Sequence, residues 1–108
     1  SARRHGGYIG KDAAFAGRPM LPHGLHGIYI SRYARIGADC CIYQNVTIGE
    51  VDRAAPQIRD HCLIGAGAVL VGGITVGDYA KIGVCFDVPA HATVVAQQPR
   101  VIVREEEP

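Results

Sequence analysis

The sequence has few of the large side chains that usually fill a protein core. Its 108 residues include no tryptophan, two phenylalanines and one methionine, and only 19% of them are charged. A chain of this length suits one domain, yet a compact globule of this size would normally use more large rings. The shortage of bulky residues therefore favours a fold whose interior is thin and built from small and branched side chains.

Other absences exclude whole classes of protein. No apolar run approaches the ~18 residues that a membrane span requires, and no charged-then-apolar leader stands at the N-terminus. The net charge of +1 gives no support for a nucleic-acid-binding surface. The four cysteines, Cys40, Cys41, Cys62 and Cys85, lack the spacing of a metal finger. We therefore expect a cytoplasmic protein with reduced thiols, no membrane contact and no nucleic-acid partner.

What the sequence has instead is a period of six. In the stretch LIGAGAVLVGGITVGDYAKIG, residues 63–83, an aliphatic residue recurs at every sixth position, and glycine follows three of the four. This interval fits neither an amphipathic helix nor a half-buried strand. It extends from Ile30 to Ile48 and again from Ile58 to Val94, and the residue four places after each aliphatic one is usually small or apolar. Self-similarity at a fixed interval indicates a repeat architecture.

Each hexad predicts one short strand and a bend, with the aliphatic residue facing inward and glycine or another small residue easing the corner. Three strands then close a triangular turn of about 18 residues, and successive turns stack as parallel strands about 4.8 Å apart. Such a stack predicts three columns of side chains. They are Ile30, Ile48, Leu70 and Val88; Ile36, Ile58, Val76 and Val94; and Ile42, Ile64 and Ile82.

The register slips once in this span, between Ile48 and Ile58, where extra residues are present. We expect residues 49–57 to protrude as a loop, which is where function is often found on a rigid scaffold. The stack also places Cys40 above Cys62. We interpret them as two small core residues, although a disulfide between them is geometrically possible.

Several stretches resemble a known family, the hexapeptide-repeat acyltransferases: IGADCCIYQNVTIG, IGAGAVLVGGITVGDYAKIG and DVPAHATVVA. The upstream stretch LPHGLHGIYIS resembles the serine acetyltransferase branch and its capsule O-acetyltransferase relatives. The resemblance implies an all-β, left-handed parallel β-helix, a hexapeptide-repeat solenoid, with one protruding loop. The left hand comes from the family alone, since parallel crossovers are otherwise right-handed. We predict a single domain over residues 1–108, with a terminal extension at 97–108.

The resemblance also implies acetyl-CoA-dependent O-acetyl transfer in a homotrimer, with sites between neighbouring subunits and a histidine as general base. Imidazole titrates near pH ~6.5, so it can take the proton of an attacking hydroxyl and pass it to the departing thiolate. His23 matches the LPH motif of the relatives and is the predicted base. His26 is the rival, while His5, His61 and His91 are interpreted as solvated residues.

Four residues are predicted to bind the acceptor, which we expect to be a small molecule. Gln44 and Asn45 can hydrogen-bond the acceptor or the oxyanion, with an amide ladder inside the coil as the alternative. Asp52 and Arg53 lie in the protruding loop, where an exposed acid–arginine pair is otherwise an ordinary loop feature.

The resemblance places the coenzyme near Ala66, Gly67, Lys81 and Gly83. Small side chains let the pantetheine arm approach the backbone, and Lys81 can meet phosphate charge. Without the resemblance these residues would be interpreted as scaffold.

The chain departs from its relatives in two places. Serine acetyltransferases carry a second histidine in a loop pattern like Asp-Arg-His-Pro, whereas this loop reads DRAAP from Asp52 to Pro56. Either His23 acts alone or the acceptor is not serine. Near the end, the stretch IGVCFDVP is shorter than in the relatives, and the family uses that segment to help bind the coenzyme tail.

Two other functions stay open on the sequence alone. The γ-type carbonic anhydrases share this scaffold and hold zinc with three histidines, although their paired histidines on one coil are missing here. A non-catalytic trimeric scaffold or degenerate acyltransferase is the other alternative. For the acyltransferase we expect no metal, with acyl-CoA and a small-molecule acceptor as partners.

Overall fold

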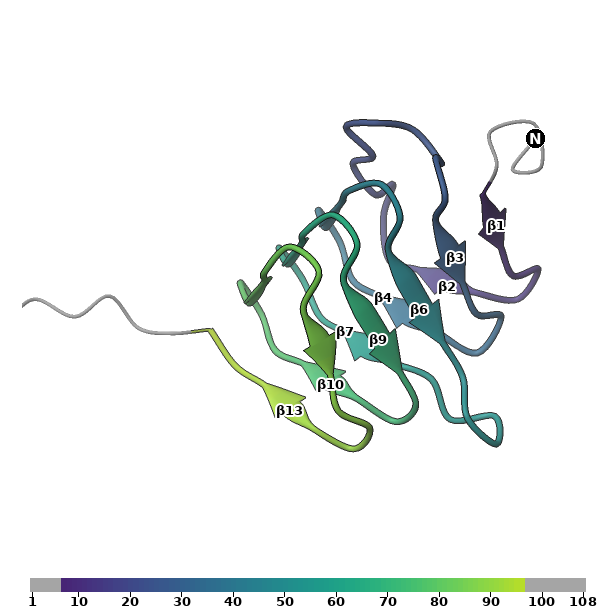
Figure 1. The fold of residues 1–108 in the computed structure, drawn as a ribbon, viewed down its shortest axis with the longest axis vertical. Coiled ribbons are helices and arrows are strands. Elements are labelled where there is room, and N and C mark those ends of the chain that lie inside the picture. Colours follow the sequence, from purple (N-terminus) through teal and green to yellow (C-terminus); the bar gives the residue numbers. More distant parts are fainter. Residues whose placement is uncertain (1–6, 97–108) are drawn as a thin grey trace, which may run out of the picture.

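The computed structural model describes residues 7–96, which hold thirteen short strands and no helix. The strands form three parallel sheets that make the sides of a triangular coil of about 4 turns (Figure 1). The all-β, left-handed parallel β-helix with one protruding loop is therefore confirmed. The predicted terminal extension at 97–108, like His5, lies outside the described residues.

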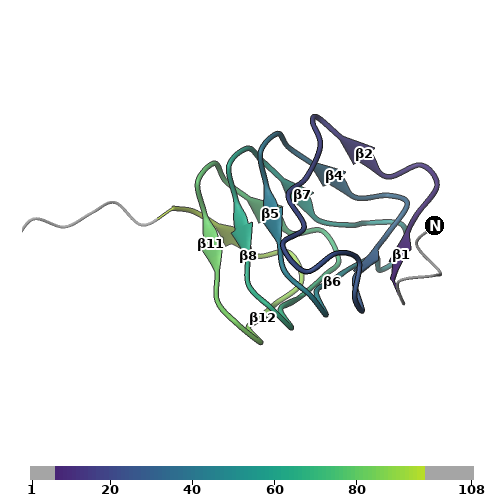
Figure 2. The same cartoon turned by 90° about the horizontal axis from the view of Figure 1, so that it is seen from above.

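Each sheet collects one strand from every coil it passes. Sheet A contains β1 (Tyr8–Ile9), β3 (Tyr29–Ile30), β6 (Thr47–Gly49), β9 (Val69–Val71) and β12 (Asp87–Val88). Sheet B contains β2 (Ala14–Phe15), β4 (Arg35–Ile36), β7 (Gln57–Ile58), β10 (Thr75–Val76) and β13 (Thr93–Val94). Sheet C contains β5 (Cys41–Ile42), β8 (Leu63–Ile64) and β11 (Lys81–Ile82), which Figure 2 shows stacked side by side.

The strand register confirms all three predicted columns. Ile30 pairs with Ile48 and Ile48 with Leu70 in sheet A, and the other two columns pair in the same way in sheets B and C. The members of the columns are buried, apart from Val94, which is half-buried at the last coil. Stacking like side chains on like removes apolar surface from water at every coil, which stabilises the solenoid without large rings.

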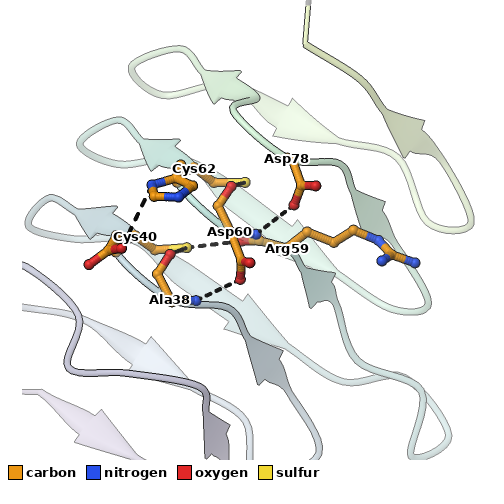
Figure 3. Close-up of polar contacts among 8 residues, drawn as sticks. Ala38, Cys40, Arg59, Asp60, Cys62 and Asp78 are labelled. Carbon is orange, nitrogen blue, oxygen red and sulfur yellow. Dashed lines mark hydrogen bonds and ion pairs between the residues drawn. The ribbon is translucent and has the colours of Figure 1, made fainter.

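The interpretation of Cys40 and Cys62 as core residues is confirmed, because both are buried free thiols on neighbouring coils. The Cys40 thiol donates to the Arg59 carbonyl at 3.1 Å (Figure 3). The Cys62 thiol donates to the Gly77 carbonyl at 3.1 Å. A hydrogen bond with Cys40, together with burial, raises the pKa of the Cys62 thiol. The two sulfurs bridge neighbouring coils through these weak hydrogen bonds.

The structure adds a first coil that the sequence reasoning missed. Strand β1 pairs with β3, β2 pairs with β4, and Met20 bridges to Cys41. Ile9, Phe15 and Leu21 pack against the core from this coil. They are themselves six residues apart, but the extra residues of the loop before β3 shift the register and hide the continuity.

The corners depart from the expectation that glycine eases each bend. Left-handed backbone is adopted instead by Asp39 (φ 58°), His61 (φ 60°) and Tyr79 (φ 63°), which succeed one another at the corner between sheets B and C. The glycine after the inward aliphatic residue serves a different purpose. A Cβ at Gly37 would lie 2.3 Å from Oδ1 of Asp60, so this position is glycine because the next coil passes too close for a side chain.

The last corner between sheets C and A also differs from those before it. Phe86 stands where the preceding coil has the buried Ala68, yet its ring is 54% exposed. A ring of this size does not fit the narrow axis that a small residue fills, so it turns outward and leaves the end of the described stack apolar.

We expect the Ile64→Ala variant to lose about 2–5 kcal/mol of unfolding free energy, because Ile64 is fully buried on the axis and truncation leaves a cavity. Leu63→Ala is the matched control: Leu63 precedes it on the same strand, points outward and is half-buried, so its loss should be nearer 1 kcal/mol. Urea denaturation followed by circular dichroism measures both. Equal losses would mean that the axis is not the main source of stability.

Candidate active site

One corner of the coil, between sheets C and A, collects most of the predicted site. We call it the histidine corner; it comprises residues 21–28, 43–46, 65–68 and 83–86. Main-chain hydrogen bonds join its coils: Asn45 N to His26 O at 2.8 Å, Gly67 N to Gln44 O at 3.0 Å, and Cys85 N to Ala66 O at 2.8 Å. Figure 1 shows these bends aligned with the loop before β3. The ladder brings residues distant in sequence into one row.

The loop that carries His23 is fixed at both ends. Two turns shape it, with Gly24 N bonded to Leu21 O at 3.0 Å and Ile28 N bonded to Leu25 O at 3.1 Å. Leu21 and Leu25 pack against the core, whereas His23 and His26 are exposed. The apolar anchors therefore hold the loop down while the imidazoles face solvent, where a substrate can reach them.

The second coil of the corner provides the surroundings of His23. The ring of Tyr43 lies 5.9 Å from the His23 ring, centre to centre, at an interplanar angle of 40°. Gln44 has a buried Oε1 with no hydrogen-bond partner among the described residues. Asn45 adopts a left-handed φ of 59°. A Cβ added to Gly27 would lie only 2.0 Å from Asn45 Oδ1.

Three of the four predicted coenzyme residues lie on the histidine corner. Ala66 and Gly67 are half-buried, with Gly67 at a φ of 73°. Gly83 is exposed, and nothing lies within 4 Å of the place a Cβ would occupy. Lys81 is exposed on β11, on the outer side of the adjoining sheet C. The backbone of this corner is thus open to a slender ligand.

Asp52 and Arg53 are not brought to this corner. They form the tip of a hairpin between sheets A and B, closed by Val51 N to Ala54 O at 2.8 Å and Ala54 N to Val51 O at 2.9 Å. Both tip residues have positive φ, 50° and 68°, as in a type I′ turn. Within one chain, sheet A separates them from His23 (Figure 1).

The third corner, between sheets B and C, holds a polar ladder of its own. Asp60 Oδ1 accepts a hydrogen bond from Ala38 N at 2.8 Å, and Asp60 N donates to Asp78 Oδ1 at 2.9 Å (Figure 3). His61 stacks on Tyr79 with ring centres 4.7 Å apart. His61 is exposed, as expected, and this stack together with the carboxylate ladder supports the bend.

The cavity of about 310 Å³ in the described part of the chain lies elsewhere. It opens on sheet B and is lined mainly by apolar residues, namely Ala14, Phe15, Ala16, Arg35, Ile36, Gly37 and Ile58. None of the predicted site residues lines it. The histidine corner, which offers exposed imidazoles and backbone groups, therefore remains the candidate site.

Known proteins similar to this chain are serine acetyltransferases. The Bacillus pumilus enzyme is 40% identical over 100 residues, which cover 85% of this chain and 46% of that protein. The Neisseria gonorrhoeae enzyme structure matches with a TM-score of 0.77 at 31% identity, over 92% of this chain and 39% of that one. A serine acetyltransferase solved in complex with CoA matches with a TM-score of 0.63 at 36% identity, over 84% and 40% of the two chains. No protein-family profile matches the chain.

The chain spans less than half the length of each of these relatives. Within residues 7–96 there is no helix of the length and apolarity needed to cross a membrane. Nor does that range contain a group of three histidine, cysteine or acidic side chains placed to hold a metal ion.

Sequence reasoning missed one residue of the corner. The six-residue pattern assigns no role to Tyr43, yet its ring lies beside the ring of His23. Its position directly before Gln44 and Asn45, on a bend of the coil, is the signal that would have indicated it.

Two glycines of the histidine loop allow a matched test of how this corner is held. Gly24→Ala should cost about 1–2 kcal/mol of unfolding free energy, because its φ is +69° but no atom lies near the new Cβ. Gly27→Ala should cost about 0.5–1.5 kcal/mol more, because the Cβ would overlap Asn45 Oδ1 and force that exposed side chain into a less favourable rotamer. Chemical denaturation of both variants measures this difference. Equal costs would show that Asn45 does not pack against the loop.

Proposed function

We propose, from the membership of this chain in the hexapeptide-repeat acyltransferases beside the serine acetyltransferases, that it transfers an acetyl group from acetyl-CoA to the hydroxyl of a small acceptor. The observation that carries the proposal is the ladder of the histidine corner. It lines up an exposed histidine loop, two amide side chains and a small-residue bend on successive coils.

His23 is the proposed general base. A thioester already has a good leaving group, so the difficult step is to make a hydroxyl nucleophilic at neutral pH. A neutral imidazole takes the hydroxyl proton as the oxygen attacks the thioester carbonyl, and the imidazolium then returns the proton to the departing CoA thiolate. The exposure of His23 on a loop that Leu21 and Leu25 anchor to the core supports this role. His26 uses its carbonyl to tie that loop to Asn45.

Gln44 and Asn45 are proposed to hold the acceptor or the oxyanion. A side-chain NH₂ donates to a developing oxyanion. The buried Oε1 of Gln44 has no protein donor among the described residues, and a buried acceptor without a donor is costly. A donor on the bound acceptor or on the amide-rich pantetheine arm would satisfy it.

Ala66, Gly67, Gly83 and Lys81 are proposed to receive acetyl-CoA. The open backbone at Gly83 and the small side chains at residues 66 and 67 leave room for the pantetheine arm beside the coil. Lys81, exposed on the adjoining sheet, can pair with a phosphate as a point charge. One of the solved relatives was crystallised with CoA, which supports this choice of ligand.

We propose that the working form is a homotrimer, and the location of Asp52 and Arg53 supports this. Their hairpin lies at the corner between sheets A and B, so it can contribute to a site around His23 only from a neighbouring copy. Serine is the first acceptor to test, since the similar proteins are named for it. Four free cysteines in the described residues suit the reducing cytoplasm, where we place the protein.

His23→Ala should lower the rate of CoA release from acetyl-CoA in the presence of serine by about 10²–10⁴-fold, the usual contribution of a general base. His26→Ala is the matched control, because it removes an imidazole from the same loop but keeps the His26 main chain that bonds Asn45. Thiol release gives the rate, and sedimentation velocity should give a trimer for all three proteins. Full turnover by His23→Ala would rule out this base.

A further inference from the structure

The imidazole of His23 lies next to one aromatic ring. Among residues 7–96, no hydrogen bond joins either ring nitrogen to another group, and its recorded side-chain neighbour is the Tyr43 ring. A general base works only if it is aimed at the proton it removes. Within the described chain, the group that can restrict the rotation of this ring is the aromatic ring beside it.

Tyr43 is itself firmly placed. Its main-chain N donates to Ile64 O at 3.0 Å, in line with strand β5. The next two residues are tied to both neighbouring coils, Gln44 O by Gly67 N at 3.0 Å and Asn45 N by His26 O at 2.8 Å. Residue 43 is half-buried. Tyr43 thus has a well-held main chain and places its ring beside the imidazole of His23.

From this geometry we infer that Tyr43 is a positioning residue for His23: its ring is a wall that limits the orientations of the imidazole. The contact is a tilted ring pair with centres 5.9 Å apart, within the range in which aromatic rings attract each other. The inference rests on the proposed role of His23 as the base. It adds a residue that the six-residue repeat does not require.

The ring, and not the phenol oxygen, is the part that matters in this inference. Tyr43→Phe should keep kcat close to that of the unchanged chain. Tyr43→Ala should lower kcat about three- to tenfold, the loss expected from one aromatic contact, with the KM for acetyl-CoA unchanged. Tyr43→Leu keeps bulk without the ring, is expected to fold even where the alanine variant does not, and should show the same loss.

The chain supplies a matched control at another corner. His61 and Tyr79 form a second histidine–tyrosine pair, with ring centres 4.7 Å apart and planes 12° apart, between sheets B and C. Tyr79→Ala removes an equivalent contact far from the histidine corner. Its kcat should not change, although the ring-proton shifts of His61 should move.

Proton NMR of the imidazoles gives a readout that does not depend on turnover. In Tyr43→Ala and Tyr43→Leu, the ring protons of His23 should lose the ring-current shift from Tyr43, and in Tyr43→Phe they should keep it. The His23→Ala spectrum assigns the resonance. Unchanged His23 shifts in the leucine variant would mean that the rings do not meet in solution, and the inference would fail.

The kinetic outcomes separate this inference from the proposed function. If His23→Ala abolishes turnover while Tyr43→Leu keeps full kcat, the base is right and the positioning role is wrong. If Tyr43→Phe lowers kcat as much as Tyr43→Leu, the hydroxyl and not the ring is the group that matters, and the inference is wrong. If His23→Ala keeps full activity, the proposed function itself fails.

Discussion

The whole molecule depends on one constraint: each inward side chain must stack on its counterpart in the neighbouring coils. Parallel register makes this possible, because Ile30, Ile48 and Leu70 occupy equivalent places on successive strands. The axis is too narrow for large rings, so it is filled by branched and small residues and by the two thiols Cys40 and Cys62. Stability comes from repetition along the axis and not from one central cluster.

The same register organises the surface. When strands stack, the bends between them stack as well, and the main-chain bonds at the histidine corner are the continuation of the sheets around a turn. Residues that are far apart in sequence, such as Gln44 and Gly67, become neighbours because Gly67 holds the position on its coil that Asn45, next to Gln44, holds on the coil before. A site on this fold is therefore a row parallel to the axis, and its members are spaced by whole turns of the coil.

Much of this architecture could be predicted from the sequence, since a period of six has few structural solutions and the inward residues from Ile30 to Val94 follow it. The first coil escaped prediction because the loop before β3 breaks the count between Leu21 and Ile30. The bends were only partly predictable: Asp39 and His61 are residue types that suit a left-handed backbone, whereas Tyr79 is not, and its main-chain N is bonded to Asp60 O of the preceding coil. The contact between the Tyr43 and His23 rings joins two coils through side chains, and a repeat pattern does not predict such a contact.

The hairpin at residues 51–54 has a consequence for how such proteins diversify. Because Val51 and Ala54 bond to each other, the segment closes on itself, and the strands on either side, β6 and β7, keep the register of coils without an insertion. The chain can therefore be longer at a bend without a change in the packing of the interior. A scaffold of this kind can lengthen, shorten or exchange a corner segment while the packing of its inner columns stays the same.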